Sequence, residues 1–163
     1  MNVTAQGTGL QEILQAIEQL TKQEVLVGIP HGETRADSEM TNAQIGYLHE
    51  TGSPSQNIPA RAFLVPGIES CQNLTSAHLV KAAEQALQGN TSAVNRHLNL
   101  AGSIAERHVR MYFVGGHFEP LSEVTIRQRR LRGRTGINPL IDTAQLRKSV
   151  TYVIQKRGES WRT

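Results

Sequence analysis

The sequence predicts an α+β fold, in which a small, mostly antiparallel sheet is packed by an N-terminal helix and two long central helices. Three observations predict this class. Apolar residues recur at helical spacing near the N-terminus and through the middle of the chain. Two short β-branched runs lie near opposite ends of the chain, and long polar or glycine-rich stretches separate the other elements. Because the length is that of one ordinary domain, we expect residues 1–163 to fold as a single unit.

The first elements follow from hydrophobic periodicity. Residues 8–22 place five aliphatic side chains on one stripe, which predicts an amphipathic helix. The β-branched run at 24–30 predicts a strand that stops at Pro30. A helix followed at once by a strand is typical of a helix that lies on a sheet.

Capping residues define the next helix. Thr41 or Asn42 can cap a short helix over the following residues, and Gly52 is suited to the position just past its end. A loop rich in serine, proline and asparagine follows it. We expect residues 60–65 beyond that loop to be extended or strand-like.

Two long helices are predicted for the centre of the chain. The first has Pro66 in its first turn and ends at Gly89. The second begins at Thr91 or Ser92 and reaches about Phe113, with its apolar residues on one stripe.

The stretch from about 115 to 140 is predicted to be a flexible loop, with a short helix from Ser122 to Arg130. Asp142 and Thr143 are expected to cap one further turn of helix. The polar end of the chain, from about 158 to 163, is expected to fray.

The alternating run at 149–157 predicts a terminal strand, with Val150, Tyr152 and Ile154 on one face. This strand is expected to pair across the fold with the strand at 24–30. Since an isolated pair of strands is marginally stable in water, we expect the 60–65 segment or a neighbouring subunit to complete the sheet.

Composition limits the classes of protein. The single cysteine, Cys71, excludes an intramolecular disulfide, and a buried, unreactive thiol is the expected state. No apolar run reaches the ~18 residues of a membrane span, and the first nine residues lack the regions of a signal peptide.

Residues that commonly carry catalysis form no recognisable set. His49 and Glu50 are adjacent, but a metalloprotease helix needs a second histidine four positions after the first, where Ser53 stands. No nucleophile, phosphate-binding or dinucleotide motif is present. We therefore expect a protein that is not an enzyme and that uses no metal ion or cofactor.

A basic cluster stands out against the mild net charge of +3. Five guanidiniums could contact phosphates, which makes a DNA-binding module the alternative function. No aromatic residues interleave them, so base stacking is unsupported, and a solvated loop or an acidic protein partner is favoured. The cluster consists of Arg127, Arg129, Arg130, Arg132 and Arg134.

Two passages carry a resemblance to a family. Residues 42–69, "NAQIGYLHETGSPSQNIPARAFLVPGIE", resemble the A-x-I-x-x-x-x-E-x-G and I-P-x-R-x-F-L passage of small tailed-bacteriophage morphogenesis proteins. Residues 139–154, "PLIDTAQLRKSVTYVI", are similar to their P-L-I-D-T-G-x-L-x-x-S-I-x-Y passage, and "PLSEVTIRQRR" resembles the passage before it. Ala62 and Ala144 depart from the family by replacing a usual proline and a usual glycine.

The resemblance implies a structural virion protein of the head–tail interface, of the tail-completion, neck or tail-terminator type. It implies a small α/β subunit that joins other copies, commonly in a ring of six, around the DNA channel. The implied partners are the adjoining connector or head-completion proteins and the tail-tube or tail-terminator proteins, with DNA passing through and no membrane. The implied location is the virion, and the host cytoplasm during assembly.

Within this resemblance, Glu50, Arg61 and Phe63 are the candidate interface or loop-anchoring residues. The guanidinium of Arg61 could hold a carboxylate such as that of Glu50, or several backbone carbonyls. The loops at 47–67 and 115–140 are then expected to reach neighbouring subunits.

Overall fold

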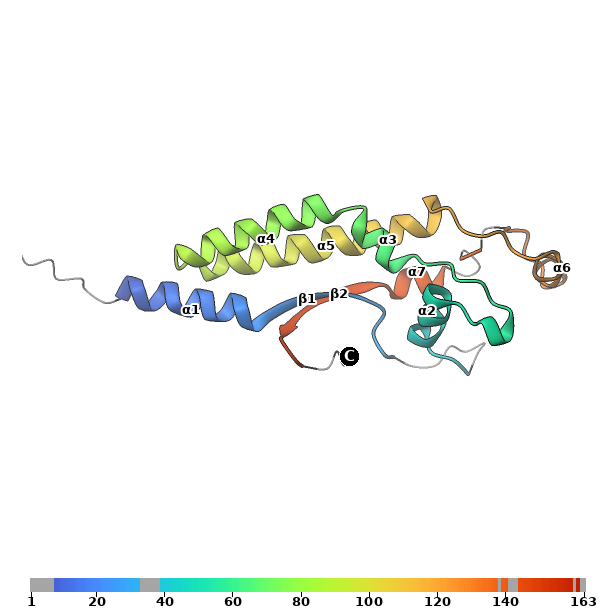
Figure 1. The fold of residues 1–163 in the computed structure, drawn as a ribbon, viewed down its shortest axis with the longest axis horizontal. Helices are drawn as coiled ribbons and strands as arrows, with labels where there is room; N and C mark the ends of the chain where they lie inside the picture. Colours follow the sequence, from blue (N-terminus) through green and yellow to red (C-terminus); the bar gives the residue numbers. More distant parts are fainter. Residues whose placement is uncertain (1–7, 33–38, 138, 141–143, 160, 162–163) are drawn as a thin grey trace, which may run out of the picture.

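The structure, a computed structural model, describes residues 8–32, 39–137, 139–140, 144–159 and 161. It is an α+β fold, as predicted, and the molecule is elongated (Figure 1). Helix α1 lies towards one end and the short helix α6 at the other, with two long helices and a small sheet between them. None of the helices in these parts of the chain combines the length and apolar character needed to cross a bilayer.

The N-terminal elements confirm their predictions closely. Helix α1 spans Thr8–Lys22, strand β1 spans Gln23–Gly28 and helix α2 spans Asn42–Thr51. Thr41 caps α2 through a reciprocal pair of hydrogen bonds with Gln44.

Gly52 ends α2 in the left-handed region, with φ of 72°. A Cβ atom at Gly52 would come within 2.7 Å of the backbone nitrogen of Ala60, so the return of the loop excludes any side chain there.

Two expectations for the next segment are wrong. Residues 60–65 form no strand and do not join the sheet, because residues 60–63 are irregular and the last two belong to helix α3, Leu64–Glu69. The single helix expected to begin at Pro66 is interrupted, and helix α4 spans Gln72–Leu87. Cys71 breaks the helical run with ψ of 11°.

Helix α5, Thr91–Gly115, is the centre of the fold, because it packs against α3, α4 and both strands. It begins at Thr91, as predicted, and the Asn90 side chain caps its N-terminus by accepting a hydrogen bond from the Ala93 N–H.

The sheet consists, within the described residues, of β1 paired antiparallel with β2, Thr151–Lys156, which confirms the expected pairing. Tyr152 and Ile154 lie on the face towards α5, opposite Val27 and Val25. A Cβ atom at Gly102 of α5 would overlap the Tyr152 ring at 2.3 Å, so this glycine allows the sheet to approach the helix.

The last third of the chain contains helix α6, Glu123–Leu131, and the short helix α7, Gln145–Ser149. Earlier in the chain, a 3-10 turn, η1, spans Pro54–Gln56 in the loop after α2. The Ser122 side chain caps α6.

Asp142 and Thr143, the expected cap of α7, lie outside the described residues. Near the end of the chain, the Trp161 ring lies against Gly28 of β1.

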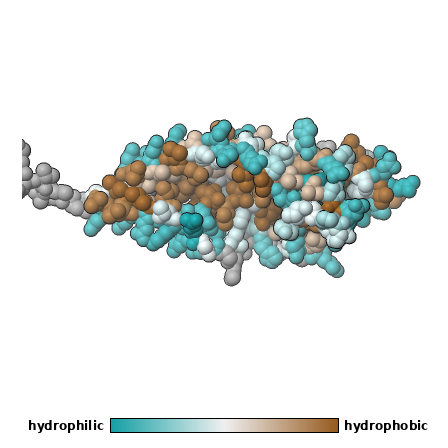
Figure 2. Space-filling model, viewed as in Figure 1, coloured by the Kyte–Doolittle hydropathy of each residue, from teal (hydrophilic) through white to brown (hydrophobic). Residues whose placement is uncertain are grey.

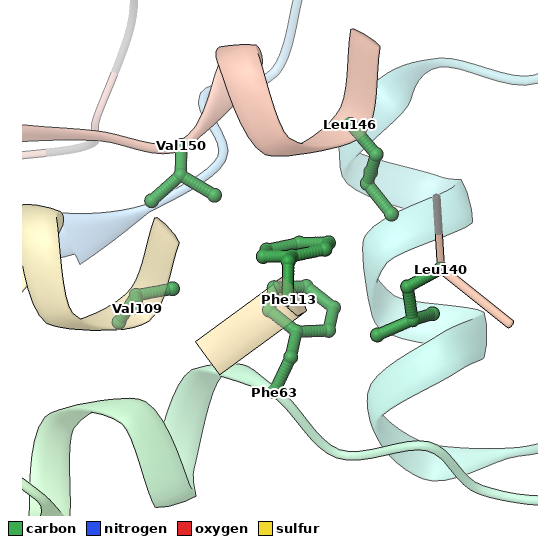
Figure 3. Close-up of a cluster of buried hydrophobic side chains, with 6 residues drawn as sticks. All are labelled: Phe63, Val109, Phe113, Leu140, Leu146 and Val150. Carbon is green, nitrogen blue, oxygen red and sulfur yellow. The ribbon is translucent and has the colours of Figure 1, made fainter. Parts of the chain in front are cut away.

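The core has two parts. The aromatic cluster surrounds the paired rings of Phe63 and Phe113 (Figure 3). The alanine cluster lies between α1, α4 and α5, where Figure 2 shows hydrophobic side chains reaching the surface over α1 and its seam with α4. The aromatic cluster is completed by Val109, Leu140, Leu146 and Val150, and the alanine cluster consists of Ala16, Ala82, Ala86, Val94 and Leu98.

Candidate functional site

Glu50, at the end of α2, acts as a remote cap for helix α3. Its carboxylate accepts three backbone hydrogen bonds, from the N–H groups of Phe63 at 2.8 Å, Leu64 at 2.9 Å and Val65 at 3.0 Å. The first N–H groups of a helix have no partner within the helix, and a negative charge there also interacts favourably with the helix dipole. Glu50 therefore fixes the start of α3 from thirteen residues away.

Arg61 anchors one loop to another. Its side chain is 8% exposed, and the guanidinium donates to the carbonyl oxygens of Glu119 at 2.9 Å and Pro120 at 3.0 Å. The Arg61 N–H also donates to the carbonyl of His49 at 2.7 Å. Of the two kinds of partner considered for this guanidinium, backbone carbonyls are therefore the ones that it contacts.

Phe63, the third candidate residue, is 1% exposed. Its ring lies 4.3 Å, centroid to centroid, from that of Phe113 on α5 (Figure 3). It thus fastens the returning loop to the central helix from inside, and its ring presents no surface to a partner within this conformation.

A cleft of about 860 Å³ opens beside Arg61. One wall comes from α2 and the loop after it, including Ile45 and Ile58; the other includes Thr125 of α6 and Leu146 of α7. The cleft therefore joins segments that lie far apart in the sequence, such as those of Ile45 and Leu146. Its lining mixes apolar side chains, such as Ile45 and Leu146, with hydrogen-bonding side chains, such as Ser122 and Thr125.

The basic cluster is divided by the fold. Arg129 donates to the carbonyls of Gly136 and Pro139, both at 3.1 Å, and so holds the loop after α6 in place. Arg127, Arg130 and Arg132 are exposed. Arg134, like Arg129, is half-buried.

Arg110 of α5 is a structural residue that the sequence analysis missed. It donates to the carbonyl of Val150 at 2.7 and 3.1 Å and pairs with Glu106 at 2.8 Å. The i, i+4 spacing of Glu106 and Arg110 is readable in the sequence, but the contact with the start of β2 is not. Arg110 joins α5 to the passage that carries the second family motif.

Cys71 and the pair of His78 and His97 lie outside the cleft lining. Cys71 is buried, and burial raises the pKa of its thiol, as expected of an unreactive cysteine. His78 and His97 meet between α4 and α5 with their Nδ1 atoms 3.2 Å apart. Across the described residues, no three His, Cys, Asp or Glu side chains are grouped to hold a metal ion.

Comparisons of the chain with protein-family models, curated proteins and solved structures give no match. Function is therefore inferred from the residues of this chain and from the resemblance that its motifs carry.

Proposed function

We propose that this protein is a structural subunit of the head–tail interface of a tailed bacteriophage. In this role, copies of the chain assemble as a ring, with six as the expected number, around the channel through which DNA passes. The subunit joins the connector or head-completion proteins on one side to the tail-tube or tail-terminator proteins on the other, in the virion and, during assembly, in the host cytoplasm. It has no catalytic role.

One observation carries the proposal most strongly: the three passages that resemble this family converge on one cleft. Ile45 and Arg61 come from residues 42–69, Thr125 from "PLSEVTIRQRR" and Leu146 from residues 139–154, and all four line it. If these passages together specify one structure, their residues are expected to lie close together in the folded chain. Ala144, which stands where the family usually has glycine, has φ of 58°, in the region that favours glycine.

The two loops around the cleft support an assembly role. Glu50 binds backbone N–H groups within the loop at 47–67, and Arg61 and Arg129 bind backbone carbonyls of the stretch at 115–140. These hydrogen bonds hold the outer surfaces of both loops in defined positions. Such pre-organisation lowers the entropy lost when a partner binds. In this proposal the cleft receives a segment of an adjoining head or tail protein.

DNA binding through the basic cluster is the second candidate, and the exposure of Arg127, Arg130 and Arg132 favours it. Contacts to phosphates predict binding to duplex DNA at ~150 mM salt, with a steep loss of affinity as salt rises. The test is fluorescence anisotropy with a labelled duplex. Binding that disappears on Arg127→Ala and Arg130→Ala would favour this candidate.

The head–tail proposal is tested on particles. Particles released from cells that carry the gene are purified on a density gradient, and the protein is located by antibody-labelled electron microscopy. We expect the label at the junction of head and tail. A protein absent from intact particles, and a deletion that leaves normal numbers of joined heads and tails, would overturn the proposal.

A cleft variant refines this test. Thr125→Trp would fill part of the cleft, because Thr125 is an exposed residue of α6 that lines it, and we expect heads and tails to accumulate separately. The matched control is Thr135→Trp, an exposed threonine outside the cleft lining, which should leave joining unchanged. Circular dichroism and thermal unfolding are the controls for whether both variants fold.

A further inference from the structure

The exposed surface of α6 is unusual for a short helix at the end of a molecule. Val124 and Leu131 are 70% and 79% exposed, and Arg127 lies between them on the same side. Since these residues are three and four positions apart, they fall within about 60° of one another around the helix. Helix α6 meets the rest of the chain through the half-buried Ile126 and through Arg129, so this stripe faces outwards.

Helix α4 carries a second exposed stripe with a matching pattern. Val80 and Leu87 are 57% and 62% exposed, and the exposed Glu84 lies between them. The buried side of α4, marked by Ala82 and Ala86, faces α1 and α5, so the stripe points away from the core. Each stripe thus holds a valine and a leucine seven residues apart, about 10 Å along the helix, with one charge between them.

The two stripes are complementary when the helices run antiparallel. The arginine follows the valine of α6 by three residues, and the glutamate precedes the leucine of α4 by three residues. Antiparallel packing therefore places Arg127 opposite Glu84, and each valine opposite a leucine. Opposite charges flanked by apolar contacts are the arrangement that gives both affinity and register at a helical interface.

One molecule cannot make this contact with itself. Figure 1 shows the C-terminal part of α4 and helix α6 towards opposite ends of the elongated fold. Contact between two different surfaces of identical chains is head-to-tail, and repeated head-to-tail contacts close into a ring or extend as a filament.

We propose that α6 of one copy packs antiparallel on the α4 stripe of the next copy, with Arg127 paired to Glu84. The inference deepens the proposed ring and rests on it for its biological role, because it names the two surfaces that join neighbouring subunits. It also assigns part of the basic cluster to protein contact, since phosphate binding gives no role to the exposed Val124 and Leu131.

The test is sedimentation velocity of the full chain over a range of concentrations. We expect Arg127→Glu or Glu84→Arg each to weaken self-association at least about tenfold, and the double variant to restore it. The matched controls are Arg132→Glu and Glu69→Arg, exposed residues off the two stripes that should leave association unchanged.

A mixing experiment tests the head-to-tail geometry. Val124→Ser with Leu131→Ser disables one surface, and Val80→Ser with Leu87→Ser disables the other. We expect each variant to be monomeric at 18.0 kDa and an equimolar mixture to form dimers, because one intact pair of surfaces remains. A mixture that stays monomeric would overturn the proposed contact.

The outcomes separate this inference from the proposed function. A wild-type chain that assembles, with stripe variants that assemble equally well, would overturn the interface and leave the ring in place. A wild-type chain that stays monomeric at ~100 µM would also overturn the interface, because a contact that builds a ring unaided is detectable there. The location of the protein in particles is measured independently, so its failure alone would overturn the head–tail role.

Discussion

The two parts of the core are built on different principles. The aromatic cluster joins the C-terminal part of α5 to loops and short helices, around the rings of Phe63 and Phe113. The alanine cluster joins three helices through small side chains such as Ala82 and Ala86, which let helix backbones approach closely. The comparison teaches that irregular segments pack through a few large side chains at defined positions. Regular helices pack closely mainly when the side chains between them are small.

Polar anchoring follows the same division. At the aromatic end, Glu50, Arg61 and Arg129 supply hydrogen bonds to backbone groups that no regular element satisfies. Buried backbone groups without partners are costly, so loops need such side chains, whereas helices satisfy their own backbone. We therefore expect the aromatic end to be more sensitive to loss of a side chain and the alanine end to addition of one.

The largest expected effect is the loss of an aromatic ring. Phe113→Ala should lower the free energy of unfolding by about 3–5 kcal/mol, because it removes the ring packed on Phe63 and leaves a cavity. Chemical denaturation measures the change. The control is Met111→Ala, exposed on the same helix, which should stay within about 0.5 kcal/mol of the wild type.

Loss of the remote cap comes next. Glu50→Ala should cost about 2–3 kcal/mol, because three N–H groups at the start of α3 lose their acceptor. Equilibrium unfolding in urea measures this cost. Glu69→Ala, an exposed carboxylate at the other end of α3, serves as the control, and an equal cost for both would argue against capping.

Added bulk should damage the alanine end. Ala82→Leu should destabilise the protein by about 1–3 kcal/mol, since the helices around this fully buried residue leave no room for three more carbon atoms. Ala77→Leu makes the same change on an exposed face of α4 and should be nearly neutral. Thermal unfolding distinguishes them, and equal melting temperatures would contradict the packing argument.

One residue at the aromatic end should gain stability when it loses its side chain. Ala144→Gly should raise the free energy of unfolding by up to about 1 kcal/mol, because φ of 58° is strained for alanine and free for glycine. The same change at Ala77, inside α4, should instead cost about 1 kcal/mol. The proposal requires that the two substitutions change the free energy of unfolding in opposite directions.

The smallest effect concerns pH at the alanine end. The pKa of His97 lies below its usual value, through burial first and then through Arg96, His78 and Lys81, with Glu84 acting in the opposite sense. The unfolded chain therefore binds a proton more readily than the folded chain does, so stability is present above about pH 6.5 and is lost as the pH falls below it. Unfolding at pH 7.5 and 5.5 should show a smaller pH-dependent loss for His97→Gln than for the wild type.

Local sequence signals predicted the elements whose stability is local. Helices α1 and α2, the strand pair and the short helix after Ser122 follow from periodicity, capping residues and alternation. Residues 60–65 differ from the prediction because their structure depends on a distant group: the Glu50 carboxylate accepts hydrogen bonds from the N–H groups at the start of α3. No pattern within the segment itself indicates that the Glu50 carboxylate of α2 will bind its N–H groups.

The candidate site shows the same limit. The motif resemblance picked out Glu50, Arg61 and Phe63, but it could not say that one is a cap, one a loop anchor and one a core residue. The five clustered arginines looked alike in the sequence, and the fold gave Arg129 a role inside the chain while leaving Arg127 exposed.

The sequence by itself determined the α+β class, the amphipathic helices and the pairing of two distant strands, because these depend on residue spacing and on the need to bury apolar faces. Only the tertiary structure decided where α3 begins, which backbone groups Glu50 and Arg61 satisfy, and which stripes of α4 and α6 stay uncovered. These features depend on distances between residues far apart in the chain. Such distances are set when the whole core packs, and no local pattern records them.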